Sequence, residues 1–186
     1  MQRLDTLRQQ YPDIIAFSNT FNPANNGRFA AYPERCLTGS APTLTDLRLA
    51  YPGAAHIQWT IAQLMAFQEN VNIPNKMSTY QLEACAQAVC DSFAYLKTTE
   101  LMLFFTRLAG GLYPVQWYGS VSPDKIIAAL RDHFVPWRNK RLDEIHYEEQ
   151  RQREQLEHSN AITWEEYLAR HGEEYRPSPL DMINHT

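Results

Sequence analysis

The strongest structural signal in this sequence is an apolar stripe that runs between residues 78 and 93. Ser78 and Gln81 stand at the spacing of a capping box, in which a serine hydroxyl accepts a hydrogen bond from the amide three residues further on. Apolar side chains then recur at intervals of three and four residues, at Leu82, Cys85, Ala86, Val89, Cys90 and Phe93. Because an α-helix completes one turn in about 3.6 residues, this spacing predicts one amphipathic helix with a buried face.

Helical patterns continue on both sides of this stripe. Residues 44–50, 54–71 and 122–134 each carry apolar positions at helical spacing. Residues 98–108 are apolar on almost every side, which is typical of the most buried helix of a core. The pair Gly110-Gly111 is expected to end that helix.

The predicted fold is therefore all-α. A compact multi-helix core domain spans residues 43–136, and Pro136 is expected to kink or restart its last helix. Residues 1–42 are predicted to form an irregular N-terminal arm with little regular structure. Leu4, Leu7 and Tyr11 could lie on one side of a short helix that ends before Pro12, and Asn and Pro then recur as turn formers. Residues 137–186 are mostly charged and predict an extended, acidic, helical tail.

Charge is unevenly distributed along the 186 residues. The net charge of −4 argues against a protein that coats nucleic acid, although it permits a local basic face. Residues 115–143 hold five cations and three carboxylates, whereas residues 144–186 hold four cations and ten carboxylates. A basic segment is thus followed by an acidic one.

Cysteine usage and hydropathy give the expected compartment. The three cysteines include no CxxC pair, which argues against a secreted disulfide framework. No stretch approaches the roughly 18 consecutive apolar residues of a membrane span, and the first residues lack the apolar run of a signal peptide. These features predict a cytoplasmic protein without membrane contact.

Motifs for catalysis and cofactor binding are missing from the sequence. It has no GxxxxGK[ST] or GxGxxG phosphate-binding loop, no GxSxG nucleophile turn and no HExxH zinc motif. His146 and Glu149 stand one helical turn apart and could share a metal ion, but the sequence favours an exposed polar helix face over a metal site. The sequence therefore predicts no catalytic residue, no cofactor and no metal. An enzyme with an unrecognised site is the alternative.

Candidate binding residues gather where aromatic side chains alternate with cations. Such pairs can stack nucleobases or anchor a partner peptide. The candidates are Arg107, Tyr113, Trp117, Tyr118, Lys125, Arg131, Arg138, Lys140 and Arg141. In the alternative interpretation, Trp117 and Tyr118 fold back and cover the helix ends.

A second candidate surface lies in the acidic tail. Trp164, Tyr167 and Leu168 form a short amphipathic cluster, which is typical of a docking peptide for a partner protein. The alternative is that this cluster packs back on its own domain.

Residues 95–141, about a quarter of the chain, resemble a functionally uncharacterised family of small helical proteins carried by mobile elements and phages of gut bacteria. The resemblance also includes the helix start at Met77-Ser78. It rests on the runs Tyr95-Leu96-Lys97, Glu100 to Phe105, Gly111-Leu112-Tyr113, Tyr118-Gly119-Ser120 and Ile126 to Arg131. It implies a role in replication or maintenance of the element.

This chain departs from the family pattern around the turn at residues 106–114. Thr106 stands where members often have arginine, Ala109-Gly110 stands where they are often basic, and Pro114 replaces a glycine. These changes lower the affinity for nucleic acid that the resemblance implies.

We therefore expect a non-enzymatic accessory or adaptor protein, linked to mobile-element DNA replication or maintenance. It would bind a protein partner and, more weakly, nucleic acid. The alternative is a structural helical protein that forms homo-oligomers through residues 137–158 and has no contact with nucleic acid.

Overall fold

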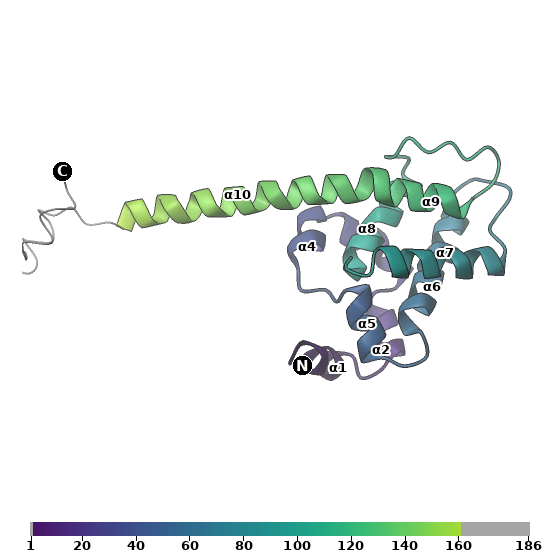
Figure 1. Cartoon of the computed structure of the whole chain (residues 1–186), viewed down its shortest axis with the longest axis horizontal. Helices are drawn as coiled ribbons and strands as arrows, with labels where there is room; N and C mark the ends of the chain where they lie inside the picture. The colour runs from purple at the N-terminus through teal and green to yellow at the C-terminus, as the bar shows by residue number, and fades with distance from the viewer. Residues whose placement is uncertain (1, 161–186) are drawn as a thin grey trace, which may run out of the picture. The chain divides into compact units, whose positions relative to one another are not determined.

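The computed structural model describes residues 2–160, and every regular element in this range is a helix (Figure 1). The elements in chain order are α1 (Gln2–Gln10), α2 (Ile14–Thr20), the 3-10 turn η1 (Pro23–Asn25), α3 (Asn26–Ala30), α4 (Pro33–Thr38), α5 (Leu44–Ala50), α6 (Ala55–Asn70), α7 (Thr79–Ser92), α8 (Thr98–Ala109), α9 (Pro123–Ala129), the π-helical turn η2 (Leu130–Phe134) and α10 (Val135–Asn160). The all-α prediction is confirmed.

Internal contacts divide the chain into two units, of which the first ends at Leu142 and the second begins at Asp143, inside α10. The first unit holds the helices from α1 to the start of α10. In the second unit, the side chains of residues 146–157 are exposed. This exposure agrees with the charged composition from which the helical tail was predicted.

The centre of the first unit is α8, as its apolar sequence predicts. Leu101, Met102 and Phe104 are completely buried. Helix α3 packs against α8, and α7 packs along α6. Gly110 caps α8, and Gly111 follows with φ of 71°, a conformation that glycine adopts without steric cost.

Helix α7 forms as the apolar stripe predicts. The Gln81 amide donates to Ser78 Oγ, and the Ser78 amide donates to Gln81 Oε1 at 2.9 Å, which completes the capping box. The buried face carries Leu82, Cys85, Ala86, Val89 and Cys90.

The first 42 residues are more regular than the expected arm, because they contain four short α-helices and a 3-10 turn. Of these helices, α1 agrees with the short helix expected before Pro12. Asp13 caps α2 by accepting from the Ala16 amide at 2.8 Å, and Pro33 lies in the first turn of α4. The turn-forming residues of this segment therefore begin helices instead of interrupting them. Phe17 and Phe21 stack at 4.6 Å and belong to the hydrophobic core, so the arm is part of the first unit.

The helix does not restart at Pro136, which was one of the two outcomes expected there. Helical residues run without interruption from Pro123 to Asn160, and the π-helical turn η2 ends at Phe134, two residues before this proline. Proline has no N–H to donate to the preceding turn. A wider π turn is a common way to accommodate such a missing hydrogen bond within a helix.

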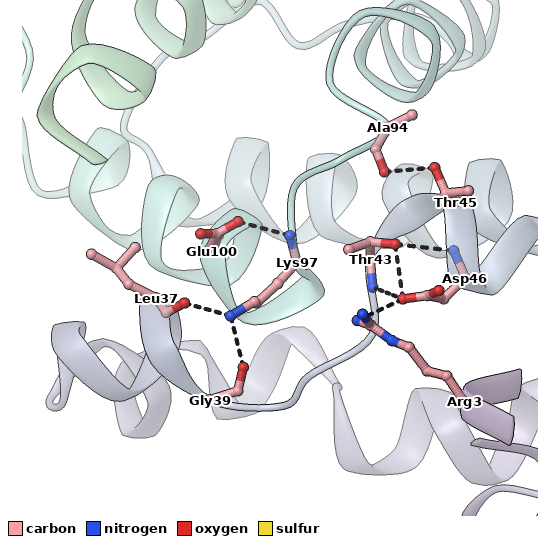
Figure 2. Close-up of polar contacts among 9 residues, drawn as sticks. All are labelled: Arg3, Leu37, Gly39, Thr43, Thr45, Asp46, Ala94, Lys97 and Glu100. Atoms are coloured by element: carbon pink, nitrogen blue, oxygen red, sulfur yellow. Dashed lines mark hydrogen bonds and ion pairs between the residues drawn. The ribbon is translucent and has the colours of Figure 1, made fainter. Parts of the chain in front are cut away.

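A polar junction ties α4 and α5 to the start of α8 (Figure 2). Lys97 Nζ donates to the carbonyl oxygens of Leu37 and Gly39, which end α4. A Cβ at Gly39 would lie 2.5 Å from the carbonyl oxygen of Arg35, so only glycine fits this close approach. Thr43 and Asp46 form the capping box of α5, whose first turn also bonds to the carbonyl of residue 94.

Glu100 connects this junction to α10. Its side chain is completely buried; Oε2 accepts from the Lys97 amide at 2.8 Å and Oε1 accepts from Arg138 Nε at 2.7 Å. The Arg138 side chain is 16% exposed. Because Lys97 also caps α4, the three helices α4, α8 and α10 are fixed around one carboxylate.

We expect Glu100→Gln to destabilise the protein by about 3 kcal/mol, because it leaves the largely buried Arg138 guanidinium without a counter-charge. Urea unfolding followed by circular dichroism measures this loss. The matched control is Asp132→Asn, which breaks the exposed pair between Asp132 and Arg131 and should leave the unfolding midpoint unchanged. Equal midpoints for Glu100→Gln and the wild type would contradict the assignment.

Stability should fall as the pH drops below 6.5, because burial of His56 on α6 lowers its pKa below that value. Nearby Arg48 lowers it further, and Asp91 opposes the shift. The unfolded chain then binds the proton at a higher pH than the folded chain does, so this contribution is complete above 6.5 and is lost on acidification. In thermal melts recorded at pH values above and below 6.5, the melting temperature of His56→Gln should fall less on acidification than that of the wild type. A wild-type slope in that variant would argue against the assignment.

Candidate arginine-rich binding site

A pocket of about 440 Å³ lies where α4, α8 and the start of α10 meet, all within the first unit. We call it the arginine pocket. Its lining residues are Ala31, Tyr32, Pro33, Glu34, Arg35, Arg107, Trp137 and Arg141. Three arginines and two aromatic rings therefore share one cavity with a single described carboxylate.

Two of these arginines lie against aromatic rings. The Arg107 Cζ atom is 3.5 Å from the centroid of the Trp137 ring, and the Arg35 Cζ atom is 5.1 Å from that of Tyr32. Such cation–π contacts orient the guanidinium and leave N–H groups at its edge for a planar acceptor. Among the described side chains, no carboxylate forms an ion pair with Arg35 or Arg107.

The third arginine, Arg141, pairs with Glu34. The Glu34 side chain is 60% exposed, so water screens this pair and its contribution to stability is small. An anion that enters the pocket can therefore compete with Glu34 for Arg141. The pocket keeps an excess of positive charge in either case.

A second and larger cavity of about 670 Å³ adjoins the arginine pocket, because Tyr32 and Arg35 line both. We call it the aromatic pocket. Its wall includes the rings of Tyr11, Phe21 and Phe29, and Arg28 adds a further cation to its lining. Among the residues that the structure describes, no carboxylate lines this cavity.

The net charge of the whole chain conceals a contrast between the two units. Residues 1–142 carry thirteen Lys and Arg against ten Asp and Glu, whereas residues 143–186 carry four against eleven. The unit that contains both pockets is therefore positive, although the chain as a whole is negative.

The structure brings only part of the predicted set of binding residues together. Arg107 and Arg141 line the arginine pocket. Arg138 instead pairs with buried Glu100 and holds the start of α10 against α8. Arg131 pairs with its neighbour Asp132 on the surface. Lys140 is exposed on α10.

The predicted loop residues lie outside both pockets. Trp117 packs 5.8 Å from Phe67, and Tyr113 stacks on Phe104 at the same separation. For Trp117, the alternative in which the ring folds back onto the helices is thus the one observed. Tyr118 is 83% exposed, with φ of 44° and Lys125 at 4.2 Å from its ring. The tail residues Trp164, Tyr167 and Leu168 lie outside the described part of the chain.

Sequence reasoning missed the N-terminal wall of the site. Arg28 lies on α3, Tyr32 stands between α3 and α4, and Arg35 lies on α4; like the candidates named from the sequence, they alternate cations with an aromatic side chain. That pattern could have identified them. No site was expected there, because residues 1–42 were predicted to have little regular structure.

The three cysteine thiols are buried and poorly reactive. Burial raises the pKa of Cys36 and Cys90 to about 11 and that of Cys85 to about 12. Since the thiolate is the reactive form, these side chains are poor nucleophiles at neutral pH. Within the described residues, no group of three or more His, Cys, Asp and Glu is arranged to hold a metal ion.

We expect the three thiols of the folded protein to resist alkylation by iodoacetamide at neutral pH, and to react fully in denaturant. Mass spectrometry of the labelled chain measures the stoichiometry. Rapid labelling of any one cysteine under native conditions would contradict the burial that raises its pKa.

Comparisons with known proteins place the chain in a family. Residues 76–176, more than half of the chain, match a family described as a family of unknown function, DUF6633. No curated protein and no solved structure matches the chain. The match includes Arg107, Trp137 and Arg141, and it confirms the resemblance to an uncharacterised family. Among the described residues, no helix is long and apolar enough to cross a membrane. The chain belongs to the DUF6633 family.

Proposed function

We propose that this protein is a non-enzymatic accessory protein that binds single-stranded nucleic acid through the arginine pocket. One observation carries the proposal: Arg35 and Arg107 converge on one cavity, stacked on aromatic rings and not ion-paired with any described carboxylate. Guanidinium groups bind phosphate oxygens in a bidentate manner, and aromatic rings beside cations are typical of single-strand binding sites.

The positions of the charges favour a local contact. The excess of positive charge belongs to residues 1–142, and the following segment carries an excess of carboxylates that repels phosphates. This charge distribution favours binding of a few phosphates in one pocket over coating of a long strand. The expected affinity is correspondingly modest.

The wider setting is part of the same proposal. The resemblance to proteins carried by mobile elements supports a role in replication or maintenance of such an element, in the cytoplasm. As an adaptor, the protein would also bind a protein partner, for which Trp164, Tyr167 and Leu168 stay the predicted docking residues.

The test is fluorescence anisotropy with a labelled strand of about ten thymidines, at about 50 and then about 200 mM salt. Wild-type protein should bind, and binding should weaken as salt rises, because phosphate contacts release counterions. Arg107→Gln and Arg35→Gln should each weaken binding about tenfold and reduce the salt slope by about 0.7.

The matched control is Arg131→Gln, because Arg131 is exposed, pairs with Asp132 and does not line the pocket. It should bind as the wild type does. Arg35 is exposed on α4, so its variant tests the pocket even if Arg107→Gln disturbs the packing of Trp137. No binding at low salt, or equal losses in all three variants, would overturn the proposal.

A further inference from the structure

We infer that the arginine pocket and the aromatic pocket together hold one nucleotide, with its phosphate at Arg35 and Arg107 and its base in the aromatic pocket. The inference rests on the proposed function and specifies its ligand. Its first support is continuity, because Tyr32 and Arg35 line both cavities. A molecule with a flat ring at one end and an anion at the other fits this arrangement.

The second support is a stack of aromatic rings that leads to the aromatic pocket. Phe17 and Phe21 lie 4.6 Å apart with 21° between their planes, and Phe21 and Phe29 lie 5.7 Å apart at 14°. Phe17 is completely buried, whereas Phe29 is half-buried and lines the aromatic pocket. A nucleobase lying on Phe29 would continue the stack by one ring.

The third support is the chemistry and size of the remaining wall. Asn19, Thr20, Asn25 and Ser40 also line the cavity, and amide and hydroxyl groups are the kinds that donate to and accept from the edge of a base. The volume of about 670 Å³ falls in the range of small-molecule sites. An acidic peptide would use the arginines but would leave the stacked rings without a partner.

The experiment compares two labelled strands of equal length, about ten thymidines and the same backbone with abasic residues. Both strands carry the same phosphates, so a difference in affinity reports on the bases. Wild-type protein should bind the thymidine strand about tenfold more tightly, since stacking of a base on an aromatic ring adds affinity.

Phe29→Leu removes the ring but keeps apolar volume, and it should bring the two strands to equal affinity. Tyr80→Leu is the matched control, because Tyr80 is a 79% exposed aromatic residue of α7 that lines neither pocket. It should keep the tenfold difference. If Phe29→Leu fails to fold, Tyr32→Leu gives a second readout, because Tyr32 is 58% exposed and its ring lines the aromatic pocket; it should also narrow the difference between the two strands.

Free thymidine monophosphate, added as competitor, distinguishes the source of the nucleotide. Displacement of the strand indicates that a free nucleotide suffices; failure to displace, together with the tenfold difference, indicates a nucleotide held within a strand. Equal wild-type affinity for both strands, with the dependence on Arg107 intact, would overturn this inference and leave the proposed function standing. Absence of binding by both strands would overturn the two together.

Discussion

The buried carboxylate of Glu100 is the constraint on which the rest of the first unit depends. A charge with no access to water must be paired and hydrogen-bonded, and Glu100 finds these partners in the Lys97 amide and the Arg138 guanidinium. The contact with the Lys97 amide caps the start of α8, and the contact with Arg138 fixes the start of α10 against α8. The ammonium group of Lys97, turned toward the end of α4, adds the third helix. The helices that this carboxylate joins are the ones that surround the arginine pocket.

Arg138 on α10 and Arg107 on α8 serve different purposes. Arg138 neutralises a buried carboxylate and orders the fold, whereas Arg107 lies on the Trp137 ring with no described carboxylate paired to it. The difference is one of surroundings, because burial requires a counter-charge and a ring face does not. The cations that are left for a ligand are therefore those whose position is set by aromatic rings.

The core of the fold could be predicted from the sequence, and the site could be predicted only in part. The stripe of α7 and the apolar run of α8 are long enough for helical periodicity to identify them. The helices before residue 42 are shorter than the roughly 12 residues that make an isolated helix even marginally stable, so they depend on packing that a linear pattern does not reveal. Likewise, Arg138 and Arg107 look alike in the sequence, because the carboxylate that separates their roles lies 38 residues before Arg138.

We propose that the Glu100 junction shapes the pocket for which nucleic-acid binding is proposed. A double-mutant cycle on strand affinity tests this link most directly. The cycle compares Arg107→Gln in the wild type and in Glu100→Gln, under conditions where circular dichroism shows both to be folded. If the junction shapes the pocket, Glu100→Gln weakens binding by itself and Arg107→Gln then costs little more. Wild-type strand affinity in Glu100→Gln would contradict this link. So would an equal loss of affinity from Arg107→Gln in both backgrounds.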